Sequence, residues 1–181
     1  YCAYGDYNEL MDFTEKMLRY IAEKVLGTAE FEYQGKTISF AKPFRRLRMA
    51  DGIKEVTGLD VNSLNTIEEA RAAAQSLGVP LDKEDSRGHI INAIFEAKVE
   101  HTLIEPTFLM DHPVEISPLT KVHRVNQGEV ERFELFVYGR ELANGYSELS
   151  DPQDQRSRLE EQAKKKAAGN EEAMPLDLDF I

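Results

Sequence analysis

The sequence predicts an α+β fold in which helices flank an antiparallel β-sheet. Two stretches, residues 31–40 and 131–149, alternate apolar and polar residues around a short turn, as β-hairpins do. Elsewhere apolar residues recur at helical spacing between capping residues. A chain of 181 residues with 41% hydrophobic content can bury one sizeable core, so we expect one domain, or one domain with an insertion.

Composition excludes several classes of function. The net charge of -11 argues against sequence-independent nucleic-acid binding, which requires clustered Lys and Arg. The single cysteine, Cys2, excludes an internal disulfide and a multi-cysteine metal site. No long apolar run and no signal-peptide pattern is present, so we expect a cytoplasmic protein without a membrane span. The chain begins without Met, and we expect it to be a piece of a longer protein.

The first predicted helix starts at a capping box formed by Asp6 and Glu9, and Gly27 ends it. Its apolar residues follow the 3.6-residue period and are expected to lie in the core: Leu10, Met11, Met17, Leu18, Ile21 and Val25. A hairpin follows across Gln34–Gly35, and it places Phe31, Tyr33, Ile38 and Phe40 on one face.

Residues 43–104 change to a pattern of short helices, predicted at 49–57, 66–77 and 86–101. We expect no catalytic residue in this segment. Near its start, Arg45, Arg46 and Arg48 predict a solvated charged face, with contact to an RNA backbone as the alternative.

The last third of the chain is predicted to contain two further elements besides the hairpin at 131–149. A strand is expected at 106–110, followed by a proline-bracketed extended loop at 113–118. Ser150 or Asp151 caps a helix that has Pro152 at its first position, runs to about Ala168 and stops at Gly169.

The hairpin at 131–149 carries more carboxylates and amides than a strand pair needs. Gly139 supplies the turn, and a two-residue loop gives paired positions opposite parity, so Glu134 and Glu141 share one face. Two like charges this close repel each other unless a cation lies between them, and Mg²⁺ prefers such oxygen ligands. The sequence therefore predicts a Mg²⁺ site on this face of the hairpin.

Three more polar-tipped residues follow at alternating positions, namely Asn144, Tyr146 and Glu148. They are out of phase with Glu141, so a common pocket requires a β-bulge between Leu142 and Asn144. No rival site competes with the hairpin. The four histidines lack partners at metal-ligand spacing and are expected to be surface or packing residues, and no Ser-His-Asp order, phosphate loop or zinc signature is present.

These residues carry a resemblance to a known family. The runs Arg132-Phe-Glu-Leu-Phe136 and Gly139-Arg-Glu-Leu-Ala-Asn-Gly-Tyr-Ser-Glu-Leu149 resemble the stretch between the second and third signature motifs of class II lysyl-tRNA synthetases. The opening Tyr1-Cys-Ala-Tyr-Gly-Asp-Tyr7 and Pro113-Val-Glu-Ile-Ser-Pro-Leu119 also match in order. The match spans nearly the whole chain, which implies that residues 1–181 are part of a catalytic domain and that 43–104 are its helical insertion.

The resemblance implies ATP-dependent activation of lysine to lysyl-adenylate, followed by transfer to tRNA(Lys), in a homodimeric parent enzyme. It implies that Glu134 and Glu141 bind ATP through Mg²⁺. Glu148 receives the lysine ε-ammonium, and Asn144, Tyr146 and Tyr1 lie beside the bound lysine. No side chain is expected to act as a general acid or base, because this reaction needs positioning and charge neutralisation.

The other signature motifs of the family, with their arginines, are not found in this sequence, so we expect the isolated chain to be inactive. Two alternatives remain open at this point. One is the synthetase paralogue that attaches lysine to a translation elongation factor, which typically has His where Ser147 stands. The other is a non-enzymatic interaction module on a synthetase scaffold.

Overall fold

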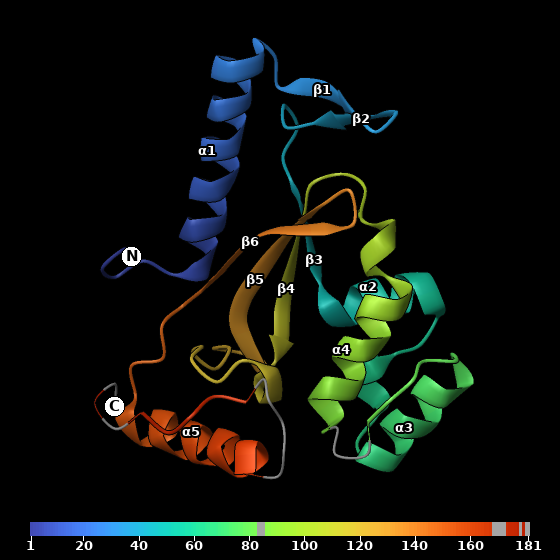
Figure 1. Cartoon of the computed structure of the whole chain (residues 1–181), viewed down its shortest axis with the longest axis vertical. Helices are drawn as coiled ribbons and strands as arrows, with labels where there is room; N and C mark the ends of the chain where they lie inside the picture. Colours follow the sequence, from blue (N-terminus) through green and yellow to red (C-terminus); the bar gives the residue numbers. More distant parts are fainter. Residues whose placement is uncertain (83–85, 168–172, 178, 180–181) are drawn as a thin grey trace.

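The computed structural model describes residues 1–82, 86–167, 173–177 and 179, and it confirms the α+β class. A central sheet has helices on both sides (Figure 1). The α-helices are α1 (Tyr7–Leu26), α2 (Met49–Thr57), α3 (Ile67–Ser76), α4 (Arg87–Lys98) and α5 (Pro152–Ala167). The strands are β1 (Glu30–Tyr33), β2 (Lys36–Ser39), β3 (Arg45–Arg48), β4 (Thr107–Pro113), β5 (Glu129–Val137) and β6 (Arg140–Tyr146).

The central sheet has the strand order β3-β4-β5-β6. The pairs β4–β5 and β5–β6 are antiparallel, as predicted, but β3 pairs with β4 in parallel, so the sheet is mixed. The sequence did not predict β3. The parallel pairing is possible because α2, α3 and α4 form the crossover between the two strands. The predicted hairpin at 31–40 is present as β1 and β2, a separate two-stranded sheet.

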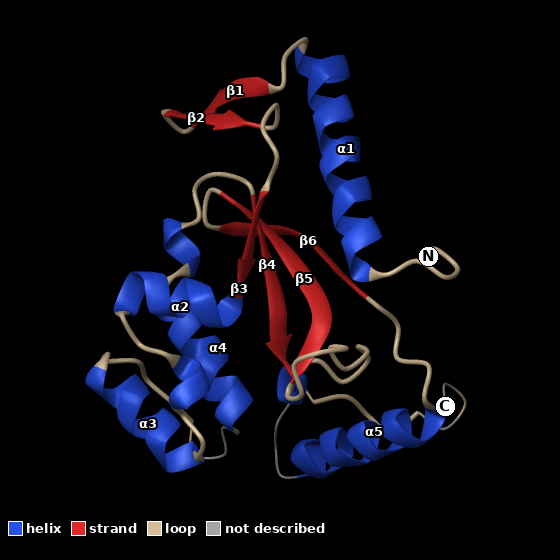
Figure 2. Cartoon of the chain, turned by 180° about the vertical axis from the view of Figure 1, so that it is seen from behind, coloured by secondary structure: helices blue, strands red, loops and turns tan. Residues whose placement is uncertain are grey.

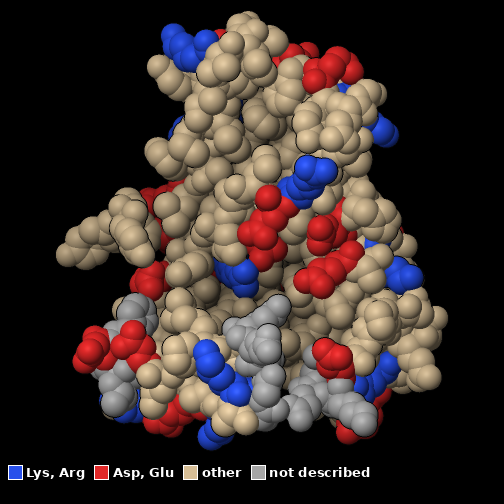
Figure 3. Space-filling view, in the orientation of Figure 1, with Lys and Arg blue, Asp and Glu red and all other residues tan. Residues whose placement is uncertain are grey.

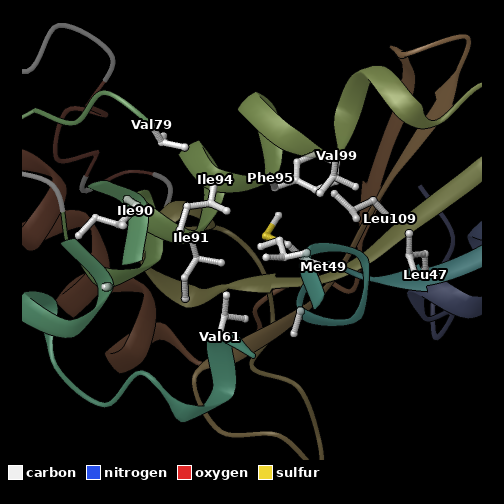
Figure 4. Packing of buried hydrophobic residues seen from close by; sticks show 14 of the residues in the cluster. Leu47, Met49, Val61, Val79, Ile90, Ile91, Ile94, Phe95, Val99 and Leu109 are labelled. Carbon is white, nitrogen blue, oxygen red and sulfur yellow. The ribbon is translucent and has the colours of Figure 1, made fainter. Parts of the chain in front are cut away.

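Alternation along the strands divides the core into two parts. Phe133 and Leu135 of β5 pack with Phe108 of β4 against α1 and the β1–β2 hairpin, which lie together in both views (Figure 2). Phe136 and Leu109 point to the other face and pack against the helices. There Met49 of α2 and Phe95 of α4 lie close together among aliphatic side chains (Figure 4). Both faces of the sheet are thus covered around its middle.

Helix α1 has the predicted ends but a narrower buried stripe than predicted. Asp6 accepts hydrogen bonds from the backbone N–H groups of Asn8 and Glu9, and Gly27 ends the helix in the left-handed region at φ 74°. Met11 is buried, whereas the following residues predicted to lie in the core are exposed: Met17, Ile21 and Val25. The reason is that α1 contacts the sheet and the hairpin along one side only (Figure 1).

The remaining elements also match closely, although α4 ends at Lys98, before the predicted end at 101. Thr66, Ser86 and Asp151 cap α3, α4 and α5 as predicted. Strand β4 runs on to Pro113, and the predicted extended loop begins with a 3-10 turn, η3 (Val114–Ile116). Two further 3-10 turns are η1 (Val61–Ser63) and η2 (Glu100–Thr102). The predicted end of α5 at Ala168 and Gly169 lies outside the described residues.

In the part of the chain that the structure describes, no helix is both long and apolar enough to cross a membrane.

Candidate functional site

The candidate site is built on the β5–β6 hairpin. Its two-residue turn consists of Tyr138 and Gly139, both at positive φ (57° and 64°), as a type I′ turn requires. Phe136 pairs with Glu141, but Leu135 pairs with Ala143, so Leu142 is one extra residue in β6. This register shift is the predicted β-bulge, and it begins one residue before the predicted position.

The bulge brings the predicted residues to one face of the hairpin. Glu134 pairs with Asn144, and Arg132 pairs with Tyr146, so these side chains share the face of Phe136 and Glu141. Glu148 continues the same alternation beyond β6, where it forms an isolated bridge with Thr120. Without the extra residue, Asn144 and Tyr146 would point to the opposite face from Glu141.

Glu134 is largely buried between two positively charged or polar neighbours. Arg132 Nη2 lies 2.6 Å from its Oε1, and His112 Nε2 lies 3.5 Å from its Oε2. Burial raises the pKa of Glu134, but the contacts with His112 and Arg132 outweigh burial and hold this pKa below its ordinary value. Glu134 is therefore a carboxylate at neutral pH.

Arg132 connects the site to the segment that follows β4. Its Nε donates to Asn144 Oδ1 at 3.3 Å, while its Nη1 donates to Ser117 Oγ at 3.0 Å and to the Ile116 carbonyl at 3.2 Å. The guanidinium thus holds Glu134 and Asn144, two of the predicted site residues, in fixed positions.

Two further carboxylates make this end of the face strongly acidic. Burial, followed by the charge of Glu134, raises the pKa of Glu141. Burial, followed by the charges of Glu96, Glu134 and Glu141, raises the pKa of Glu100. Acidic atoms accordingly gather near the middle of the molecular face in Figure 3. Because neighbouring carboxylates, after burial, contribute to both raised pKa values, a cation bound here would be favoured.

A second group lies at the other end of β6. Burial, followed by the charges of Glu148 and Tyr1, raises the pKa of Tyr146, so the structure brings these three predicted residues close together. Glu148 is exposed, and among the described residues it makes no ion pair. Tyr1 is fully exposed at the start of the chain. This end therefore offers a carboxylate, without an ion-pair partner among the described residues, close to the phenol of Tyr146.

The predicted Mg²⁺ ligands, Glu134 and Glu141, lie on this face of the hairpin. No group of three or more His, Cys, Asp or Glu side chains in the described residues could hold a metal ion. Two carboxylates on one face nevertheless match the way Mg²⁺ binds at nucleotide sites, where phosphates and water supply the other ligands. Glu134 and Glu141 fit such a partial ligand set.

Sequence reasoning missed three residues of this site: Arg132, His112 and Glu100. Arg132 could have been found, because it has the same parity as Glu134 on one strand. His112 was expected to be a surface or packing residue, and it is fully buried against Glu134, with both ring nitrogens lacking a hydrogen-bond partner. No local signal indicates that contact or the approach of Glu100, because both depend on tertiary packing.

The three arginines at the start of the helical segment are engaged in ion pairs. Arg45 pairs with Glu55, Arg46 with Asp12, and Arg48 with Asp111 and Glu129. These contacts give the cluster a structural role in joining β3 to its neighbours.

Comparison with known proteins gives matches over the whole chain. Residues 1–181 match the family model described as tRNA synthetases class II (D, K and N). Three similar proteins, each named lysine–tRNA ligase, match over 100% of this chain. They come from Trichormus variabilis (54% identical, 32% of its length), Thermosynechococcus vestitus (52%, 36%) and Carboxydothermus hydrogenoformans (49%, 37%). The chain thus spans about a third of the length of the curated relatives it matches.

Proposed function

The chain belongs to the class II tRNA synthetases of the D, K and N group, and from this premise we propose that the protein containing it is a lysine–tRNA ligase. We propose that residues 1–181 are part of its catalytic domain and that residues 43–104 are a helical insertion without catalytic residues. The proposal extends to tRNA(Lys) as acceptor, to a homodimeric enzyme and to the cytoplasm as its location. The relatives named lysine–tRNA ligase support this choice of amino acid.

The observation that carries the proposal is the bulge at Leu142. It gives one face of the hairpin a cation-binding end, with Glu134 and Glu141, and an end with an unpaired carboxylate, Glu148. A substrate with a cationic tip complements Glu148, and a metal-bound polyphosphate complements Glu134 and Glu141 through its metal ion. Lysine and ATP together meet this description.

At the ATP end, Glu134 and Glu141 would hold Mg²⁺ against the phosphates. When bound there, Mg²⁺ neutralises phosphate charge and orients the nucleotide. Arg132 and His112 keep Glu134 ionised and fixed before substrate arrives, so its position requires no rearrangement.

At the lysine end, Glu148 would accept hydrogen bonds from the ε-ammonium. An amino acid that lacks the ammonium would leave this carboxylate unpaired when the pocket closes around it, which disfavours such substrates. Asn144, held through its carbonyl oxygen by Arg132, and the phenols of Tyr146 and Tyr1 would orient the rest of the lysine.

The reaction joins the two ends. The lysine carboxylate attacks the α-phosphorus of ATP, the bond to the bridging oxygen of pyrophosphate breaks, and lysyl-adenylate forms. The terminal ribose hydroxyl of tRNA then attacks the carbonyl carbon and releases AMP. The described side chains contribute by orientation and charge.

Two variants of the full-length protein test the lysine end and the ATP end of the proposed site separately. Glu148→Gln should raise the KM for lysine about 100-fold or more and leave the KM for ATP within about twofold, because it removes the ammonium partner. Glu141→Gln should instead impair ATP use and raise the Mg²⁺ concentration needed. ATP–pyrophosphate exchange measures both. Equal effects of Glu148→Gln on the two KM values would contradict the ammonium role.

A further inference from the structure

A second polar network lies directly behind the lysine end of the hairpin. Glu131 is opposite Ser147 in the strand pairing, and its side chain points to the face away from Arg132 and Tyr146. Glu131 is completely buried, and Arg124 binds both of its oxygens, with Nε at 2.6 Å and Nη2 at 3.0 Å. A fully buried carboxylate with a bidentate arginine is a rigid anchor.

Ser147 joins this anchor to the candidate pocket. Its hydroxyl helps to hold the pKa of the Glu131 carboxyl below its ordinary value, its N–H donates to the Glu131 carbonyl at 2.9 Å, and its own carbonyl accepts from Lys121 N–H at 2.9 Å. Ser147 stands between Tyr146 and Glu148 in the chain. Fixing its backbone therefore fixes the points from which both neighbouring side chains project toward the pocket.

The same network reaches the segment that carries Tyr1. The backbone N–H of Tyr7 donates to Ser147 Oγ at 3.0 Å, and Arg124 Nη2 donates to Asp6 Oδ2 at 2.9 Å. Asp6 is also the N-cap of α1. The start of α1 and the end of β6, far apart in the sequence, are thus tied together through one carboxylate.

We propose that Glu131, together with Ser147 and Arg124, is a positioning unit for the amino-acid pocket. It sets the distance between Tyr146 and Glu148 on one side and the N-terminal segment with Tyr1 on the other, without touching the substrate. This inference rests on the proposed function, and it adds residues that determine how well lysine is held.

The test uses Glu131→Gln and Ser147→Ala in the full-length protein. Each should raise the KM for lysine about tenfold while the KM for ATP stays within about twofold, because displacement is confined to the lysine end. Ser147→Thr keeps the hydroxyl and should restore the lysine KM. If Glu131→Gln does not fold, Ser147→Ala, which removes one oxygen atom, decides the matter.

Glu129→Gln is the matched control. Glu129 lies on the same strand and is bound at both oxygens by an arginine, Arg48, but among the described residues its side chain contacts neither Ser147 nor α1. Its substitution should lower the melting temperature and leave the lysine KM unchanged. The inference is overturned if folded Ser147→Ala leaves the lysine KM unchanged, or if both KM values rise by the same factor.

Glu148→Gln distinguishes a failure of the positioning unit from a failure of the lysine assignment. If it raises the lysine KM and Ser147→Ala does not, only the positioning unit is wrong. If Glu148→Gln also has no effect on the lysine KM, the lysine assignment itself is wrong.

Discussion

Arg132 lies among the carboxylates of the candidate site. It binds Glu134 and Asn144, and it also donates to Ser117 Oγ and the Ile116 carbonyl. The charges of Glu134, Glu141 and Glu100 act on one another, so the guanidinium offsets part of their repulsion when no other cation is present.

Arg132→Met should therefore lower the free energy of unfolding by about 1–3 kcal/mol, since it removes charge-assisted hydrogen bonds from a largely buried carboxylate. Added Mg²⁺ should recover more stability in this variant than in the wild type, because the acidic face then lacks its own cation. Thermal unfolding with and without MgCl₂ measures both effects. Arg140→Met, at the exposed start of β6, is the control and should change neither quantity. An equal Mg²⁺ response in both variants would contradict the account.

Glu131 should make part of the stability depend on pH. Burial alone would raise its pKa, but hydrogen bonds from Arg124 and Ser147 hold the pKa below the ordinary value of 4.5. The ionised form therefore stabilises the fold above pH 4.5, and this contribution is lost as the pH falls through the lowered pKa. Glu131→Gln should cost about 2–3 kcal/mol at pH 7 and progressively less below pH 4.5. Urea unfolding at a series of pH values measures the difference, and a cost that does not shrink in acid would refute this origin.

At the level of single residues, the sequence was informative wherever alternation along a strand alone decides to which face of the sheet a side chain points. The parity of Glu134 and Glu141 across a two-residue turn predicted their common face, and the structure places both on that face, with Glu134 opposite Asn144 and Glu141 opposite Phe136. The burial of His112 could not be predicted, because it depends on the pairing of β4 with β5 and on a register shift at Asp111. The roles assigned to these site residues stay predictions.

At the level of elements, local patterns located the helices, and pairing between distant segments decided the rest. A capping residue and a terminal glycine marked the ends of α1, and a terminal glycine marked the end of α2. Strand β3 was missed because its sequence, Arg-Arg-Leu-Arg, buries only Leu47 and has no clear strand pattern. It becomes a strand through its pairing with β4, which is separated from it by the whole helical segment.

Removing the caps of α1 and α3 should have different effects on the lysine KM if residues 43–104 lack catalytic residues. Thr66→Ala removes the cap of α3, and Asp6→Ala removes that of α1; each should cost about 1 kcal/mol of stability. Only Asp6→Ala should also raise the lysine KM, because Asp6 binds Arg124. Thermal unfolding and pyrophosphate exchange in the full-length protein give the two readings. A raised lysine KM in Thr66→Ala would show that the helical segment takes part in substrate binding.

At the level of the whole molecule, the apolar core residues and the acidic residues of the candidate site occupy different regions of the sheet. The middle is covered by two apolar clusters, while Glu134 and Glu141 of the candidate site lie on β5 and on β6, the edge strand of the sheet (Figure 1). Composition predicted a sizeable core, but it could not predict that the core would be divided by the sheet. That division follows from alternation along β4 and β5.

The isolated chain should show no ATP–pyrophosphate exchange. It spans about a third of the length of its relatives, and Arg132, the arginine beside the two carboxylates proposed for Mg²⁺, is already bound to Glu134 and Asn144. Turnover measured on the 181-residue chain, at a rate comparable to that of the full-length protein assayed in parallel, would contradict this expectation.

Tyr146 and Ser147 project from neighbouring positions to opposite sides of one strand. Under the proposed function, a smaller side chain at position 146 should therefore make room for lysine derivatives with larger side chains, provided that the Ser147 hydroxyl is kept. Libraries that vary position 147 together with position 146 would also remove the hydroxyl that accepts from the Tyr7 N–H, and the backbone at Tyr146 would be held less firmly.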